Sequence, residues 1–161
     1  MSIAFEGSAI IVRNIPASRH FYESLLQQEV AFSVGESYVA YKGKFSIWQE
    51  RSASALMHER SRFLATTDPE AMEQFELYFE TADLDAAWNE LKKQQVPAVH
   101  AIREQPWGQR CFRVKDPDGY VVELAEPMPV VVQRCLDSGM TVEETAARTM
   151  LPADMIVAMK G

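Results

Sequence analysis

Apolar and polar residues alternate in the first fifty positions in a way that predicts one helix among short strands. The apolar run at residues 8–12 (SAIIV) is typical of a buried strand. Residues 17–27 repeat apolar side chains at helical spacing, and Asn14 and Pro16 suit the N-cap and first turn of a helix. Further strands are predicted at 30–34, 38–41 and 45–50, separated by glycine-containing turns. The order is β-α-β-β-β.

The same order returns after residue 75. Residues 75–81 alternate as a strand, and Asp83 can cap a helix over 84–94. Strands are predicted at 96–102, 109–114 and 120–125, with the turn DPDG at 116–119 before the last one. Two βαβββ units in one chain predict an α+β fold, in which curved mixed sheets surround a cup and helices cover the outer faces.

The remaining segments divide the chain. Residues 51–74 are polar without a clear period, which indicates a linker between halves at about 5–50 and 75–126, with a short helix at 69–73. Three short helices are predicted beyond the 1–126 module, at 130–137, 141–148 and 152–160. Thr141 and Glu144 have the spacing of a capping box. Residues 127–161 are therefore a short all-α extension.

Charge and composition exclude several classes of protein. The net charge of -7 and the pI near 5.0 argue against binding of nucleic acid. The extension has a helix-turn-helix-like pattern but carries three basic and four acidic residues, which favours a small helical cap on the module or on a partner subunit. The two cysteines have no CxxC spacing. No apolar run approaches the roughly 18–20 residues that span a bilayer, so we expect a cytoplasmic protein without membrane contact.

Three motifs resemble a known family. They are VRNIPASRHFYESLL after the first strand, FETADLDAAWNELKKQQV at the start of the second half, and PWGQRCFRVKDPDGYVVEL at its end. Together, over about residues 5–126, they resemble the vicinal oxygen chelate superfamily of glyoxalase I, bleomycin-resistance proteins, fosfomycin-resistance enzymes and extradiol dioxygenases. The resemblance implies a ligand-binding cup and a homodimer, and it leaves the activity open.

The resemblance also implies positions for metal ligands. The ligand on the last strand falls on Glu123, and the ligand that opens the second half falls on Glu76. The ligand on the first strand falls near Gly7, where no histidine is present. Two carboxylates make a poor site for a transition metal, which usually takes three or four protein ligands. We therefore expect no cofactor, and the alternative is a divalent metal on Glu76 and Glu123.

Strand alternation selects the other candidate residues of the cup. Tyr78 shares a face with Glu76, whereas on strand 109–114 either Arg110 and Phe112 or Cys111 and Arg113 face inward. Glu123 is a candidate general base, with Arg110 as its partner or as a stabiliser of negative charge. The candidate ligand-binding residues are Trp48, Glu76, Tyr78, Trp107, Arg110, Phe112 and Glu123. The structural alternatives are a core Trp48 and a Glu123 that is solvated or paired with Arg110.

Three functions fit these residues. The first is a metal-free protein of the bleomycin-resistance kind that binds a small molecule in the cup. The second is a lyase or isomerase of the glyoxalase type, or a dioxygenase-like member, that uses Glu76 and Glu123 with or without a metal. The third is a ligand-sensing regulator with a helix-turn-helix-like tail. Nothing in the sequence identifies the ligand.

Overall fold

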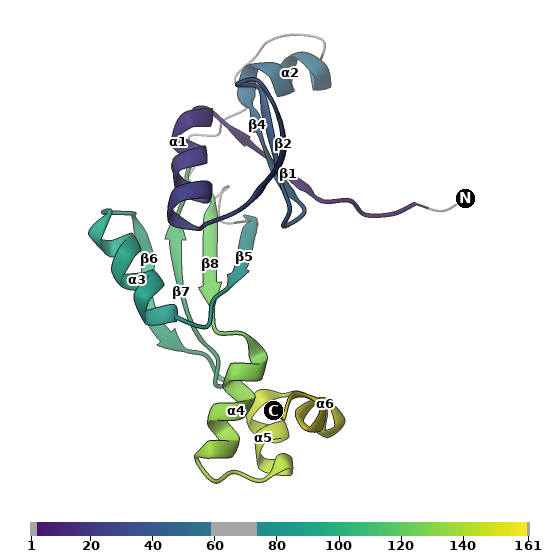
Figure 1. Ribbon diagram of the computed structural model, residues 1–161, viewed down its shortest axis with the longest axis vertical. Helices are drawn as coiled ribbons and strands as arrows, with labels where there is room; N and C mark the ends of the chain where they lie inside the picture. The colour runs from purple at the N-terminus through teal and green to yellow at the C-terminus, as the bar shows by residue number, and fades with distance from the viewer. Residues whose placement is uncertain (1–2, 59–73, 161) are drawn as a thin grey trace. The chain divides into compact units, whose positions relative to one another are not determined.

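The computed structural model describes residues 3–58 and 74–160, and the chain divides into two compact units (Figure 1). The first unit runs to residue 74 and includes the turn 116–120, and the second comprises 75–115 and the chain from 121 onward. Each unit contains one four-stranded mixed sheet. The predicted α+β class with two βαβββ repeats is confirmed, whereas a cup formed by both sheets stays a prediction.

The first unit has the strand order β1-β4-β3-β2. Its strands are β1 (Ser8–Val12), β2 (Val30–Val34), β3 (Tyr38–Tyr41) and β4 (Phe45–Gln49). β1 and β4 are parallel, and the other pairs are antiparallel. Helix α1 (Ile15–Arg19) begins at the predicted cap, where the Asn14 side chain accepts a hydrogen bond from the Ala17 amide at 3.0 Å. It continues directly into a π-helix, η1 (His20–Leu25), which the sequence did not predict.

One face of the first sheet carries the core of this unit. Tyr22 of η1 lies against Phe45 of β4, with ring centroids 5.2 Å apart. Val39, Tyr41 and Ile47 are buried on the same side. The opposite face is apolar and partly open, and its side chains are Ile11, Phe32, Val34, Tyr38 and Trp48. The two faces follow the alternation of side chains along each strand.

One element of the first unit differs from the prediction. The chain leaves β4 directly into helix α2 (Glu50–His58), where the sequence predicts the end of a strand and a linker. The small side chains of Ala53 and Ser54 are the parts of this helix that are completely buried. The helix predicted at 69–73 lies outside the described residues.

The second unit repeats the topology as β5-β8-β7-β6. Its strands are β5 (Glu76–Glu80), β6 (Ala98–Glu104), β7 (Arg110–Lys115) and β8 (Val121–Ala125). Helix α3 (Leu84–Lys93) is capped by Asp83, which accepts from the Ala86 amide at 3.1 Å. α3 lies against β6 and β7 (Figure 1), and Trp88 meets Phe112 of β7 edge to face at 5.1 Å. This contact identifies the core face of the second sheet.

The DPDG turn reverses the chain between β7 and β8, and its side chains form hydrogen bonds within the first unit. The Asp116 carboxylate is buried and accepts hydrogen bonds from the Tyr22 hydroxyl at 2.8 Å and from the amides of Asp118 and Tyr120 at 2.9 Å. Burial raises the pKa of Asp116, and these three hydrogen bonds oppose the rise. Asp118 accepts from the Arg13 guanidinium at 2.8 Å.

The extension forms three helices, α4 (Met128–Asp137), α5 (Val142–Thr149) and α6 (Ala153–Met159). The predicted capping box is confirmed, because Thr141 and Glu144 each accept from the other's backbone amide. Val131, Val132 and Ile156 are completely buried and form the core of this part. Among the residues described, no helix has both the length and the apolar character needed to cross a lipid bilayer.

Candidate functional site

The second sheet carries a charged face on the side away from α3. Phe112 points toward α3, so alternation turns its neighbours Cys111 and Arg113 to the other side of β7. In register, Glu123 of β8 lies opposite Arg113 of β7 and opposite Tyr78 of β5. The structure therefore selects the second of the two orientations that the sequence left open for this strand.

Arg113 is the centre of this face. Its Nε donates to Glu76 Oε2 at 2.6 Å, and its guanidinium forms an ion pair with Glu123. Its Nη1 lies 3.2 Å from His100 Nε2 and 3.8 Å from Cys111 Sγ. We call these five residues the Arg113 cluster. A planar guanidinium suits this role because it presents several N–H donors in fixed directions.

The hydrogen bonds of His100 define its protonation. Its Nδ1 lies 2.8 Å from the carbonyl oxygen of Ala101, which can only accept. Nδ1 therefore carries the proton and donates it. Nε2 is then unprotonated and accepts from Arg113, which has no acceptor of its own.

Burial distinguishes the two carboxylates of the cluster. Only 5% of its side chain is exposed, against 35% for Glu76. Burial raises the pKa of Glu123, the charge of Arg113 opposes the rise, and the nearby Glu76 carboxylate adds to it. Two carboxylates thus share one guanidinium, and the cluster keeps an excess of negative charge.

Tyr78 lies next to the cluster, and Gln109 links it to Trp107. The Tyr78 hydroxyl donates to Glu80 at 2.9 Å and accepts from Gln109 Nε2 at 3.0 Å. Burial and the Glu80 hydrogen bond raise the pKa of Tyr78 to about 12, and the Gln109 hydrogen bond opposes this. The Trp107 indole donates to Gln109 Oε1 at 2.9 Å. Half of the Tyr78 side chain is exposed, so its ring is open to a ligand.

Arg110 and Phe112 lie elsewhere, and the predicted pairing of Arg110 with Glu123 is wrong. Arg110 Nη2 donates to both carboxylate oxygens of Asp85 at 2.9 Å, and Nη1 lies 3.4 Å from Glu126. Phe112 is completely buried against α3. The alternation of β7 accounts for both placements, because these two residues share the face opposite to Arg113.

Trp48 belongs to the first unit. It is half-buried on β4, lies opposite Ile11 in register and meets Tyr38 edge to face at 5.9 Å. Its ring is on the open apolar face of the first sheet and outside the core that Tyr22 and Phe45 form.

The residues present do not fit the metal centre that the family resemblance implies. Gly7 has φ of +152°, and a Cβ there would lie 2.2 Å from the Lys44 carbonyl oxygen, so no side chain fits without a backbone shift. Glu76 and Glu123 are both engaged by Arg113. Over 3–58 and 74–160, no group of three or more His, Cys, Asp or Glu side chains is arranged to hold a metal ion.

Sequence reasoning missed the central place of Arg113 and the contribution of His100. The signal for Arg113 was present, because Arg113 and Glu123 are equally far from Asp118 at the centre of a tight antiparallel turn. Such a turn places equidistant residues opposite each other. No comparable signal exists for His100, since β6 pairs with β7 through two register irregularities.

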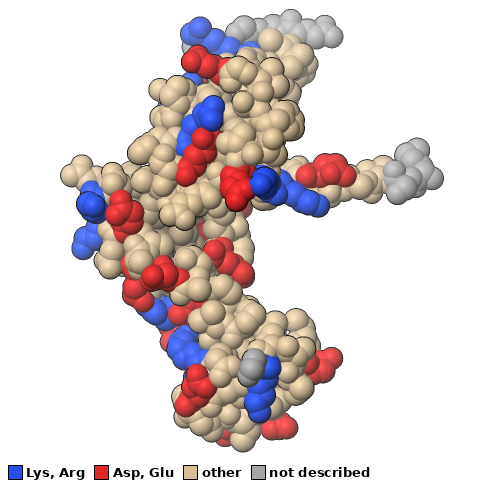
Figure 2. All heavy atoms as spheres, in the orientation of Figure 1, with Lys and Arg blue, Asp and Glu red and all other residues tan. Residues whose placement is uncertain are grey.

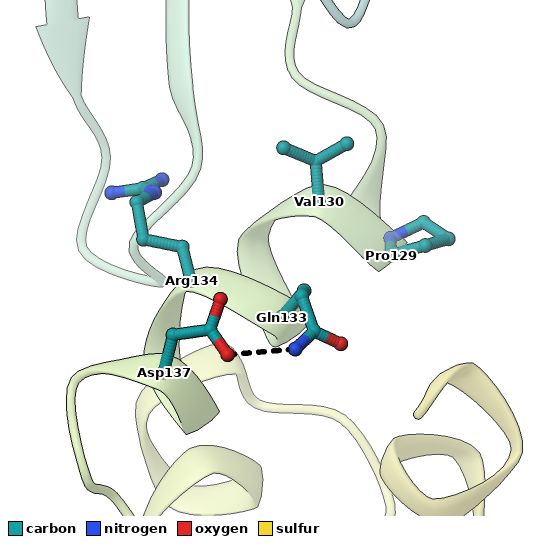
Figure 3. Close-up of a pocket in the computed structure, with 5 residues that line it drawn as sticks. All are labelled: Pro129, Val130, Gln133, Arg134 and Asp137. Atoms are coloured by element: carbon teal, nitrogen blue, oxygen red, sulfur yellow. Dashed lines mark hydrogen bonds between the residues drawn. The ribbon is translucent and has the colours of Figure 1, made fainter. Parts of the chain in front are cut away.

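Charged residues elsewhere are mixed in sign. On the face drawn in Figure 2, and within the described residues, basic and acidic side chains lie interspersed without a continuous basic surface. A shallow depression on α4 is lined by Pro129, Val130, Gln133, Arg134 and Asp137 (Figure 3). Gln133 donates to Asp137 there at 2.8 Å. Neither feature resembles a surface for phosphates.

Comparisons with known proteins agree with this fold. A family model described as a glyoxalase-like domain matches residues 5–129. A solved protein of unknown function from Agrobacterium tumefaciens is 32% identical, with a TM-score of 0.70 over 79% of this chain and 96% of its own.

Two named structures share the fold at lower identity. Lactoylglutathione lyase from Agrobacterium tumefaciens is 17% identical, with a TM-score of 0.59 over 80% of this chain and 96% of its own. The fosfomycin resistance protein FosX from Mesorhizobium loti is 16% identical, with a TM-score of 0.54 over 79% and 94%. No curated protein matches the chain. By its family match, the chain belongs to the glyoxalase-like domain family of the vicinal oxygen chelate superfamily.

Proposed function

We propose that this protein binds a small organic molecule on the charged face of its second sheet, without a resident metal. We call this face, which carries Glu76, Tyr78, Glu80, Arg113 and Glu123, the Arg113 face. The observation that carries the proposal is the Arg113 guanidinium, which contacts both Glu76 and Glu123. A fixed internal cation there offsets part of the negative charge of the two carboxylates that a metal would otherwise need to neutralise. The lactoylglutathione lyase and the fosfomycin resistance protein of similar fold support binding of small molecules as the class of function.

The open groups of this face indicate the chemistry of the ligand. Glu76 and Glu80 present carboxylate oxygens, and Tyr78 presents a half-exposed aromatic ring. Carboxylates accept hydrogen bonds and attract positive charge. A ligand that combines an amine or amide donor with a flat apolar part satisfies both kinds of group.

A thermal-shift screen tests this proposal. Compounds of this class are expected to raise the unfolding temperature of the wild type, because a ligand of the native state stabilises it. The shift should disappear in Glu76→Gln and persist in Glu90→Gln, since Glu90 lies on α3 and contacts Gln94 and Lys93. Stabilising compounds that act equally on both variants would contradict binding at the Arg113 face.

Glu123 supports a second candidate function, which is isomerisation by proton transfer. Its raised pKa suits a general base that takes a proton from the carbon next to a carbonyl group. For a substrate with a hydroxyl group on that carbon, Arg113 would stabilise the negative charge of the enediolate. Glu123 would return the proton to the former carbonyl carbon, and the hydroxyl proton would pass to the former carbonyl oxygen to give the isomer. Glu123→Gln should abolish such turnover and leave ligand binding measurable. A homodimer stays part of this proposal, and sizing in solution tests it.

A further inference from the structure

The extension reaches back to the second sheet through two arginines that lie beyond the family domain, which ends at residue 129. Arg134 of α4 donates to the Gly108 carbonyl oxygen at 2.9 Å, and Arg148 of α5 donates to the carbonyl oxygen of Pro106. Both arginines also pair with Glu104, at 3.6 Å from Arg134. The carbonyl groups of Pro106 and Gly108 lie on the loop 105–109 between β6 and β7, and Glu104 is the last residue of β6.

The extension holds this loop through close, charge-assisted contacts. Arg134 also pairs with Glu126 at 2.6 Å, and the carboxylate of Glu126 is buried. Figure 3 shows the Arg134 guanidinium extending from α4, on the side away from Pro129. Gly108 has φ of +83°, and a Cβ there would lie 3.6 Å from Val131 and 3.7 Å from Arg148. Hydrogen bonds from charged donors are stronger than neutral ones, so the extension fixes the loop backbone.

Each end of the loop holds a side chain of the charged face. Gln109 Nε2 donates to the Tyr78 hydroxyl at 3.0 Å and to the Glu126 carbonyl oxygen at 2.7 Å. Gln105 Nε2 donates to Cys111 Sγ at 3.0 Å. Tyr78 lies beside Glu123 in register, and Cys111 belongs to the Arg113 cluster. A continuous series of contacts therefore joins the extension to the charged face within the second unit.

We propose that Arg134 and Arg148 are positioning residues for the Arg113 face, acting through Gln105 and Gln109 of the loop 105–109. The description of that face as a ligand surface rests on the proposed function, whereas the positioning rests on the contacts above. Coupling of this kind is reciprocal, so occupancy of the face also stabilises the docking of the extension. The extension is then a part of the binding site as well as an addition to the domain.

Alkylation of Cys111 by N-ethylmaleimide measures this positioning without a ligand. Peptide mass spectrometry follows Cys111 and Cys135 separately in the full-length protein. Arg148→Met should raise the Cys111 rate about fivefold, the factor that corresponds to loss of a hydrogen bond. Lys160→Met is the matched control, because it removes a charge from the extension and Lys160 forms no ion pair among the described side chains. It should leave the rate unchanged, and Arg148→Lys should fall between the two.

A second background separates positioning from general loosening. Gln105→Leu removes the link to Cys111 directly and should raise the alkylation rate by itself. If Arg148 acts through Gln105, then Arg148→Met should have little further effect in Gln105→Leu. The inference would be overturned if the rate increases of the two single variants multiplied in the double variant. It would also be overturned if Arg148→Met and Lys160→Met gave equal alkylation rates.

These results are independent of the proposed function. A screen that yields no ligand for the Arg113 face would remove the proposed function, and the alkylation rates would still measure the positioning. Ligands that bind while Arg148→Met leaves Cys111 protected would remove the inference and retain the proposed function.

Discussion

The two halves of this protein share one topology but present different open faces. Each sheet places its first strand parallel to its last and antiparallel neighbours beyond, and each has a helix on one face. The open face of the first sheet is apolar, with Ile11, Phe32, Val34, Tyr38 and Trp48. The open face of the second sheet carries Glu76, Tyr78, Glu80, Arg113 and Glu123.

The difference teaches that topology and chemistry are set by different residues. The buried alternate positions that hold each sheet to its helix are apolar in both halves, and they define the fold. The other alternate positions differ between the two halves. Gly7 and Glu76 illustrate this difference. At the start of the first half, Gly7 packs against the backbone of Lys44, whereas at the start of the second half Glu76 presents a carboxylate.

The largest expected effect is the loss of Arg113. Arg113→Met leaves the buried Glu123 without its ion-pair partner, which should lower the free energy of unfolding by about 3 kcal/mol. Urea unfolding measures this. The double variant Arg113→Met with Glu123→Gln should recover most of the lost free energy of unfolding, since it removes the uncompensated charge. A free energy of unfolding that is unchanged in Arg113→Met would show that the charged face is not organised by this cation.

A smaller effect is expected in the first half, at Gly7. Gly7→Ala introduces a Cβ that meets the Lys44 carbonyl oxygen, in a backbone conformation that favours glycine. We expect a loss of about 2 kcal/mol from this strain, measured in the same urea assay. Gly35→Ala is a useful comparison because nothing lies within 4 Å of a Cβ there. An equal response at both glycines would contradict the close backbone contact.

The smallest expected effect is a pH dependence that belongs to the second half. The pKa of Glu123 is raised above its ordinary 4.5, so the folded state binds this proton more tightly than the unfolded state. The resulting stabilisation is present below pH 4.5 and is lost as the pH rises through the folded pKa of Glu123. The difference in unfolding free energy between wild type and Glu123→Gln should therefore change in this direction with pH. A flat difference would show that burial does not perturb Glu123.

Much of the fold could be predicted because short-range patterns determine it. Alternation located the strands, and Asn14, Asp83 and the Thr141–Glu144 pair marked helix starts through local hydrogen bonds. Helix α2 was missed because it begins at Glu50, directly after β4, inside the segment that was interpreted as the end of a strand and a linker. The π-helix was missed because it continues a helical pattern with one changed hydrogen-bond step.

The charged face could be predicted only in part. Glu76 and Glu123 were selected by resemblance, and Tyr78 by alternation. Arg113 stayed an alternative because β7 carries an arginine on each face, at positions 110 and 113. The link between Arg148 and the loop 105–109 was beyond sequence reasoning, because it joins segments about forty residues apart with no shared pattern.

Metal content tests the central claim most directly, which is that an internal guanidinium takes the place of a metal at Glu76 and Glu123. The measurement is elemental analysis of the wild-type protein, purified without chelator and compared with Arg113→Met. The account predicts only substoichiometric traces of Mn, Fe, Ni and Zn in the wild type. A stoichiometric ion that is retained by the wild type would contradict it.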